Sequence, residues 1–166
     1  MNTVLLAKGH VRNDFSCEET SLTEYIRKQV SQDVRKGLST CFVVTDDQQK
    51  VVGYYTLTSE SLGRNSIPES YQKKIPKNYN APVILLGRLA RDLSRKGTGL
   101  GEYLLLDALF RSYTLSIESI GAMAVAVDPI NHHAVQFYER YGFVLLPDSG
   151  KMFLPMQVIS KLFLST

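Results

Sequence analysis

The stretch at residues 83–111, VILLGRLARDLSRKGTGLGEYLLLDALFR, restricts the fold of this chain more than any other part of the sequence. It begins with an apolar run and then alternates between apolar and polar residues, which predicts a strand that continues to Leu93. A basic, glycine-rich turn follows at residues 94–101. Apolar residues then recur at helical spacing, at Leu104, Leu105, Ala108 and Leu109. The stretch therefore predicts a strand, a glycine turn and a helix in succession.

Such a turn has the geometry of an anion-binding site. The first turn of a helix has backbone N–H groups without internal partners, and the helix dipole adds partial positive charge there. Glycines let the backbone approach a phosphate closely, and Arg95 and Lys96 add full charges beside the turn. We therefore expect a cofactor that carries a pyrophosphate. The dinucleotide fingerprint G-x-G-x-x-G does not fit, because Glu102 stands where its third glycine would be. The G-x-x-x-x-G-K-[ST] loop does not fit, because Lys96 precedes the glycines.

The turn resembles the acetyl-CoA pyrophosphate loop of the GNAT acetyltransferases, Q/R-x-x-G-x-G/A, and reads Lys96-Gly97-Thr98-Gly99-Leu100-Gly101 here. Taken alone, the turn fits a plain connection between a strand and a helix equally well. A second stretch at residues 131–143, NHHAVQFYERYGF, resembles the family signature N-x-x-A-x-x-F-Y-x-x-x-G-F. Two motifs in the expected order are a specific signal, so the resemblance implies an acetyl-CoA-dependent N-acetyltransferase.

The remaining pattern predicts an α/β domain with the element order β-α-β-β-β-α-β-α-β-β. We expect strands at 4–7, 41–45, 51–58, 121–127, 143–146 and 152–156, and helices that start at Thr20 or Ser21 and at Asn131. Residues 59–81 are expected to form an extended loop with a short helix near 69–73. The resemblance implies the GNAT fold, with a mixed central β-sheet flanked by helices. Its two central parallel strands, here 86–93 and 122–127, splay apart. We expect a single GNAT acetyltransferase domain over residues 1–166.

Composition excludes several other classes of protein. Hydrophobic residues make up 44% and charged residues 21%, as in ordinary soluble domains, and the net charge of +3 permits an anionic ligand or RNA. Two cysteines, Cys17 and Cys41, and three scattered histidines predict neither a disulfide framework nor a metal site. No stretch approaches the roughly 18 apolar residues of a membrane span, and no signal peptide is recognisable. We expect a cytoplasmic protein.

The resemblance also implies roles for individual residues. Asn131 contacts the pantetheine arm and the Tyr138 hydroxyl protonates the departing sulfur. Strand amides polarise the thioester carbonyl, and the amides of the turn hold the pyrophosphate. The implied cofactor-binding residues are Leu89, Arg91, Leu93, Lys96, Gly97, Thr98, Gly99, Gly101, Glu102 and Asn131. The simpler readings are that Tyr138 packs in the core and that Asn131 only caps its helix.

No general base is placed by a motif. Glu60 and Asp92 are weak candidates for a base that acts through water, and both are otherwise read as surface charges. An α-amino group has a pKa of about 7.7–8.0, whereas a lysine amine has a pKa of about 10.4 and needs a base far more. The absence of an obvious base therefore favours an α-amine as the acceptor.

A closer resemblance within the family concerns the acceptor. The runs FSC (15–17), SLTEYI (21–26), CFVV (41–44), VVGYYTL (51–57) and LGRLA (86–90) look like the GNAT toxins of type II toxin–antitoxin modules. Those toxins acetylate the α-amino group of aminoacyl-tRNA, so this resemblance implies a charged tRNA acceptor, an antitoxin partner and a homodimer. Glu18 stands where they often carry glycine, and Arg91 where they usually carry a small apolar residue.

Two other readings remain open. The same chemistry on a small amine, such as a free amino acid or a polyamine, needs no RNA surface. A non-catalytic CoA- or RNA-binding module needs no Tyr138. Six basic residues could form an RNA surface or be ordinary solvated charges: Arg88, Arg91, Arg95, Lys73, Lys74 and Lys77.

Overall fold

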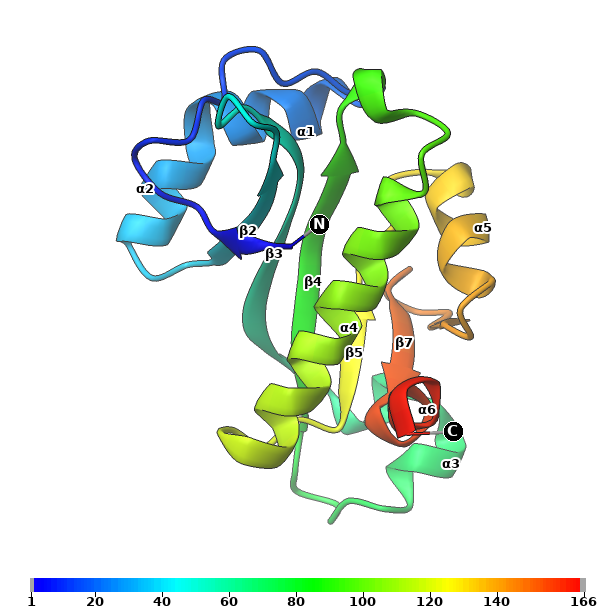
Figure 1. Cartoon of the computed structure of the whole chain (residues 1–166). Coiled ribbons are helices and arrows are strands. Elements are labelled where there is room, and N and C mark those ends of the chain that lie inside the picture. Colours follow the sequence, from blue (N-terminus) through cyan, green and yellow to red (C-terminus); the bar gives the residue numbers. More distant parts are fainter. Residues whose placement is uncertain (1, 165–166) are drawn as a thin grey trace. The chain divides into compact units, whose positions relative to one another are not determined.

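The computed structural model describes residues 2–164 and shows alternating strands and helices (Figure 1). No helix in this described part has the length and apolar character needed to cross a membrane. The elements are β1 (Val4–Leu5), α1 (Thr20–Glu24), π-helical η1 (Tyr25–Gln29), α2 (Val30–Arg35), β2 (Thr40–Thr45), β3 (Val51–Leu62), 3-10 helix η2 (Arg64–Ser66), α3 (Glu69–Gln72), β4 (Ala81–Arg91), 3-10 helix η3 (Leu93–Arg95), α4 (Leu100–Glu118), β5 (Ala124–Val127), α5 (His132–Glu139), β6 (Val144–Leu145), β7 (Met152–Pro155) and α6 (Met156–Leu164).

The strands form a mixed sheet in the order β1-β2-β3-β4-β5-β7-β6, and β4 and β5 run parallel. The residues fall into two compact units. Unit 1 comprises Met1–Thr58 and Gly87–Ala108, and unit 2 comprises Ser59–Leu86 and Leu109–Thr166. β3, β4 and α4 each contribute residues to both units. The mixed sheet with flanking helices confirms the predicted fold class.

The core of unit 1 is built around Tyr54 of β3, which is fully buried. Its ring packs edge-on against Phe15 at a centroid distance of 5.5 Å and stacks on Tyr25 at 6.3 Å. Its hydroxyl donates to the Leu22 carbonyl at 2.6 Å. Burial of three aromatic rings thus joins β3 to the first helical segment, and the hydrogen bond satisfies a polar atom that would otherwise be costly to bury.

The first helical segment differs from its prediction. The helix starts after Glu19, and no side chain caps it, so the predicted cap at Thr20 or Ser21 is wrong. Five residues in the middle form a π-helical turn. The helical segment ends at Arg35, and Gly37 follows it with a left-handed φ of 74°.

Unit 2 contains the parallel pair. The register of β4 and β5 runs from Val83↔Ala124 to Leu86↔Val127, and β4 itself continues to Arg91. β5 then pairs antiparallel with β7, from Ala124↔Pro155 to Val127↔Met152. Because four residues of β5 have partners on both sides, all four are buried, as their unbroken apolar sequence requires.

Several predictions need correction, and one of them is the start of β5, which lies at Ala124 instead of residue 121. β3 extends to Leu62, so residues 59–62 are strand instead of loop, because the alternation of exposed and buried residues continues there. Leu93 lies outside β4, in η3. The C-terminal helix α6 was not predicted, although its apolar residues are spaced for a helix, because strand-forming residues immediately precede it. The short helix near 69–73 is confirmed as α3.

We expect Tyr54→Phe to lower the free energy of unfolding by about 1 kcal/mol, because the change removes the hydrogen bond from the Tyr54 hydroxyl to the Leu22 carbonyl. Urea denaturation measures this loss. The matched control is Tyr79→Phe, whose hydroxyl has no hydrogen-bond partner among residues 2–164 and whose side chain is exposed. Equal stability of the two variants would contradict the role of the Tyr54 hydroxyl.

Candidate active site

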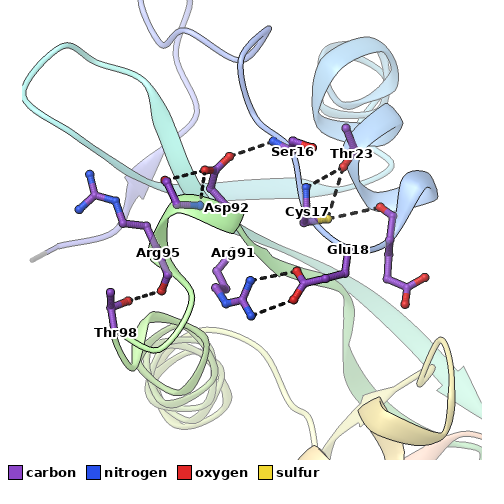
Figure 2. Close-up of polar contacts among 10 residues, drawn as sticks. Ser16, Cys17, Glu18, Thr23, Arg91, Asp92, Arg95 and Thr98 are labelled. Carbon is purple, nitrogen blue, oxygen red and sulfur yellow. Dashed lines mark hydrogen bonds and ion pairs between the residues drawn. The ribbon is translucent and has the colours of Figure 1, made fainter.

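The segment after β4 is held in place by Asp92. Its Oδ2 accepts the Ser94 N–H at 2.9 Å and the Ser94 hydroxyl at 2.6 Å, which caps η3 (Figure 2). Its Oδ1 accepts the Ser16 N–H at 2.8 Å, and the Leu93 N–H donates to the Ser16 carbonyl at 2.8 Å. Partial burial alone would raise the pKa of Asp92, but the hydrogen bonds from Ser94 and Ser16 outweigh it and lower that pKa. Asp92 therefore has a structural role that argues against its use as a base.

The glycine turn (residues 96–102) follows η3 and leads into α4, which is 19 residues long. Gly97 and Gly99 adopt left-handed φ values of 78° and 82°, and nothing lies within 4 Å of the space that a side chain would fill at either position. These two residues therefore give the turn a left-handed backbone conformation, and no other part of the chain fills the space beside them.

Backbone donors gather at this turn without acceptors. The N–H of Lys96 donates to the Leu93 carbonyl and the N–H of Thr98 to the Arg95 carbonyl. No acceptor in residues 2–164 takes the other N–H groups of the turn, which belong to Gly97, Gly99, Leu100, Gly101 and Glu102. Five free donors at the start of a long helix form a site for an anion such as a pyrophosphate. The structure thus brings the predicted residues of the turn together, with the donors of Lys96 and Thr98 already used.

Arg91, the last residue of β4, forms a two-pronged ion pair that sequence reasoning did not find. Its Nη1 and Nη2 donate to Glu18 Oε1 and Oε2 at 2.9 and 3.0 Å (Figure 2). The hydrogen bond from Arg91 is the main reason that the pKa of Glu18 is lowered. A Cβ added at Gly101 would lie 3.9 Å from Arg91 Cγ, so the side chain runs along the first turn of α4. No local pattern reveals this pair, because 73 positions separate its members in the sequence.

Arg88 is also engaged inside unit 1. Its guanidinium carbon lies 3.6 Å from the centroid of the Tyr25 ring, a cation–π contact. The Tyr25 hydroxyl donates to Asp33 Oδ2 at 2.9 Å, and burial followed by this hydrogen bond raises the pKa of Tyr25 to about 12. Arg88 and Arg91 therefore both have internal partners, which weakens the prediction that they form part of an RNA surface.

The two cysteines have structural surroundings. Cys17, beside Glu18, donates its N–H to Thr23 Oγ1 at 3.0 Å and its thiol to the Glu19 carbonyl at 3.3 Å (Figure 2). Cys41 is buried, and burial raises the pKa of its thiol to about 12, which removes the reactive thiolate.

Asn131 and Tyr138 lie in unit 2, on α5. Asn131 caps this helix, because its Oδ1 accepts the Ala134 N–H at 3.0 Å, as predicted. The Tyr138 ring is buried between Phe137 and Phe143, each at a centroid distance of 5.3 Å. The tyrosine therefore packs in the core.

The Tyr138 hydroxyl is nevertheless available for chemistry. It has no hydrogen-bond partner among residues 2–164, and it is not one of the fully buried unpartnered atoms of this part of the chain. Burial raises the pKa of Tyr138, which keeps the phenol protonated. A protonated hydroxyl with no internal acceptor is suited to donate a proton to a ligand.

Glu60, the other candidate base, belongs to an ion cluster in unit 2. Lys151 Nζ lies 3.5 Å from Glu60 Oε1 and 2.8 Å from Asp128 Oδ2. Burial alone would lower the pKa of Lys151, but the Asp128 and Glu60 carboxylates raise it. Glu60 Oε2 is buried and has no partner in the described structure. A donor from a ligand or a water molecule would satisfy this oxygen, so Glu60 stays the better candidate of the two.

The predicted site residues thus fall into two groups. The glycine turn, Leu89 and Arg91 on β4, and Leu93 in η3 all lie in unit 1. Asn131 and Tyr138 lie in unit 2.

Comparison with known proteins gives a consistent result. The sequence profile of the Acetyltransferase (GNAT) family matches residues 9–143. The chain is similar to a tRNA-acetylating toxin of Mycobacterium tuberculosis (strain ATCC 25618 / H37Rv), with 38% identity over 133 residues, or 80% of this chain and 78% of the toxin.

Solved structures agree with this finding. AtaT complexed with acetyl-methionyl-tRNAfMet superposes with a TM-score of 0.89 at 28% identity, over 98% of both chains. AtaTR bound with AcCoA gives a TM-score of 0.85 at 29% identity, over 98% of this chain and 97% of that chain.

We expect Gly99→Ala to weaken CoA binding at least tenfold. The left-handed backbone is strained by about 1–2 kcal/mol once a side chain is present, which moves the N–H groups of the turn. Titration calorimetry with CoA measures the change. Gly150→Ala is the control, because Gly150 has a φ of 74° and equally open surroundings but lies in the turn before β7. The assignment of the turn fails if both variants bind CoA as the wild type does.

Proposed function

The chain belongs to the GNAT acetyltransferase family, and we propose that it transfers the acetyl group of acetyl-CoA to the α-amino group of aminoacyl-tRNA. The observation that carries the chemistry is the set of five free N–H groups where the glycine turn enters α4. The similarity to a tRNA-acetylating toxin supports the acceptor. The family match over residues 9–143 includes residues of both units, which supports one acetyltransferase domain over residues 1–166.

We assign the contacts of the co-substrate as follows. The free donors of the glycine turn hold the pyrophosphate, and the neighbouring Lys96 adds a full charge. The backbone of β4 at Leu89 and Arg91 holds the pantetheine and polarises the thioester carbonyl, because alternate residues of a strand direct their N–H groups to the same edge. Leu93 is left out of this set, since its N–H already donates to Ser16. Asn131 contacts the pantetheine arm.

The reaction follows from these assignments. The neutral amine attacks the thioester carbon, the new C–N bond forms and the C–S bond then breaks. The departing thiolate takes the proton of the Tyr138 hydroxyl, and the amine nitrogen loses one proton to water. An α-amine with a pKa of about 7.7–8.0 is substantially neutral near pH 7.5, so this proton loss needs no strong base. Glu60 Oε2 is the candidate that would take this proton from the water.

A second candidate acceptor is a small amine. One observation favours it: Arg88 and Arg91 are engaged within unit 1, so they do not contribute to a free RNA surface. A binding module without catalysis is the weaker alternative, because it would not need the unpartnered hydroxyl of Tyr138.

The proposal extends to partners and to place of action. A solved structure contains an AtaT mutant toxin bound to the C-terminus of the antitoxin AtaR, so an antitoxin is proposed as a protein partner here. Aminoacyl-tRNA is a cytoplasmic substrate, so the proposed function places the protein in the cytoplasm. A homodimer remains part of the same proposal.

Transfer of labelled acetyl from acetyl-CoA tests the proposed acceptor. Charged tRNA and a panel of free amino acids and polyamines are supplied side by side. We expect label on charged tRNA that is released when the ester is hydrolysed. If label appears only on free amines, tRNA is not the acceptor. If the protein binds CoA but labels no acceptor, it is a binding module without catalysis.

We expect Tyr138→Phe to lower kcat at least 100-fold and to leave the Kd for CoA within about twofold, because the change removes the proton donor and keeps the ring that packs in the core. Single-turnover kinetics and calorimetry measure the two quantities. Tyr113→Phe on α4 is the matched control and should keep wild-type rates. Wild-type kcat in Tyr138→Phe would remove Tyr138 from the mechanism.

The pH dependence should have only a rising limb. The rate rises with pH until the α-amine is neutral, near pH 8. Because burial raises the pKa of Tyr138 above its usual value of about 10, the phenol stays protonated beyond that point, and no fall is expected up to about pH 9. Initial rates of acetylation between about pH 6 and pH 9 measure this profile. A fall above pH 8 that disappears in Tyr138→Phe would contradict the raised pKa of Tyr138.

A further inference from the structure

The connection between two strands of the sheet carries an excess of positive charge. The 19 Lys and Arg residues exceed the 16 Asp and Glu residues by three. The connection between β3 and β4, residues 63–80, contains the cations Arg64, Lys73, Lys74 and Lys77 and the single carboxylate Glu69. The connection therefore carries four positive charges against one negative charge. This distribution marks a surface for a polyanion.

Within unit 2, part of this connection lines a polar pocket of about 410 Å³. Arg64 and Lys77 both line it, and Asp148 is its only carboxylate. The Arg64 Nε donates to the Ile75 carbonyl at 3.3 Å, while its two terminal nitrogens and the Lys77 ammonium have no partner in residues 2–164. This contrasts with Arg91 and Lys151, which are ion-paired. Two unpaired cations in one pocket can hold a phosphate.

An apolar pocket of about 540 Å³ adjoins the polar one, because Tyr79 and Asn80 line both. Its other walls include Tyr71, Pro82 and Met123. Tyr79 is 62% exposed, although it is a large aromatic residue with no hydrogen-bond partner in the described part of the chain. An exposed aromatic ring between a pocket for anions and an apolar pocket offers a stacking surface for a planar group.

We infer that residues 63–80 bind single-stranded RNA, with Arg64 and Lys77 on a phosphate and Tyr79 stacked on an adjacent base. A base in a duplex is already stacked on its neighbours, so an aromatic platform selects unpaired nucleotides. An acidic peptide would pair with the cations but would not need the exposed ring. The inference rests on the proposed function in one respect, since the RNA it identifies is the unpaired 3′ end of the charged tRNA.

Four variants test this surface. The double variant Arg64→Gln/Lys77→Gln removes the phosphate contacts, and Tyr79→Ala removes the platform while Tyr79→Phe keeps it. Arg35→Gln/Lys36→Gln is the matched control, because it removes the same two residue types at an exposed site in unit 1. Each variant is assayed with charged tRNA, with an amino acid amide as a small acceptor, and for binding to an oligoribonucleotide that ends in CCA at several salt concentrations.

We expect the KM for charged tRNA to rise about tenfold in the double variant and in Tyr79→Ala, and to stay within about twofold in Tyr79→Phe and in the control. For binding of the oligoribonucleotide, the slope of the logarithm of the binding constant against the logarithm of the salt concentration should fall in magnitude by about 0.7 in the double variant, because one phosphate loses its contacts. Rates with the amino acid amide should not change.

Wild-type KM and salt slope in all four variants would overturn the inference, as would an equal loss of activity on both acceptors. Loss of antitoxin binding with an unchanged KM for charged tRNA would assign the surface to a protein partner and would also overturn it. If the wild type binds the oligoribonucleotide through these residues but does not acetylate charged tRNA, the proposed function fails and the RNA site stands.

Discussion

The five backbone N–H groups of the glycine turn need an acceptor that residues 2–164 do not supply, and the surrounding structure keeps them in this state. Gly97 and Gly99 adopt backbone angles that other residues avoid. Asp92 closes the preceding turn and, through Ser16, fixes it to the loop before α1. An unsatisfied donor is costly when it stays buried, so these donors at the start of a long helix favour the binding of an acceptor. An anionic co-substrate is the physical complement of this arrangement.

The charged side chains divide into those with internal partners and those without. Within unit 1, Arg88 makes a cation–π contact with Tyr25, and Arg91 forms an ion pair with Glu18. The carboxylate of Glu18 and the guanidinium of Arg91 neutralise each other in a two-pronged ion pair. The unpaired cations of unit 2, Arg64 and Lys77, are therefore the better candidates for contacts with RNA.

Sequence alone predicted most of the fold, because its strongest signals are local. The alternation of apolar and polar residues predicted the strands, and the helical spacing of apolar residues predicted α4. Asn131, as a capping residue, predicted the start of α5. The errors arose where distant residues decide. β3 continues to Leu62, beyond the end of its apolar run. Leu93 is not part of β4, because Asp92 caps a 3-10 helix that begins at Leu93. The Glu18–Arg91 pair and the cluster of Glu60 with Lys151 join positions far apart in the sequence, which no periodicity can reveal.

The most direct test of the central claim is to locate the acetyl group in the product. Charged tRNA is incubated with the protein and acetyl-CoA and digested with a nuclease, and the 3′-terminal nucleoside is analysed by mass spectrometry. The account predicts an N-acetylated aminoacyl group still esterified to the terminal adenosine, and no such product with Tyr138→Phe. An unmodified aminoacyl-adenosine, with acetyl groups found only on free amines, would contradict it.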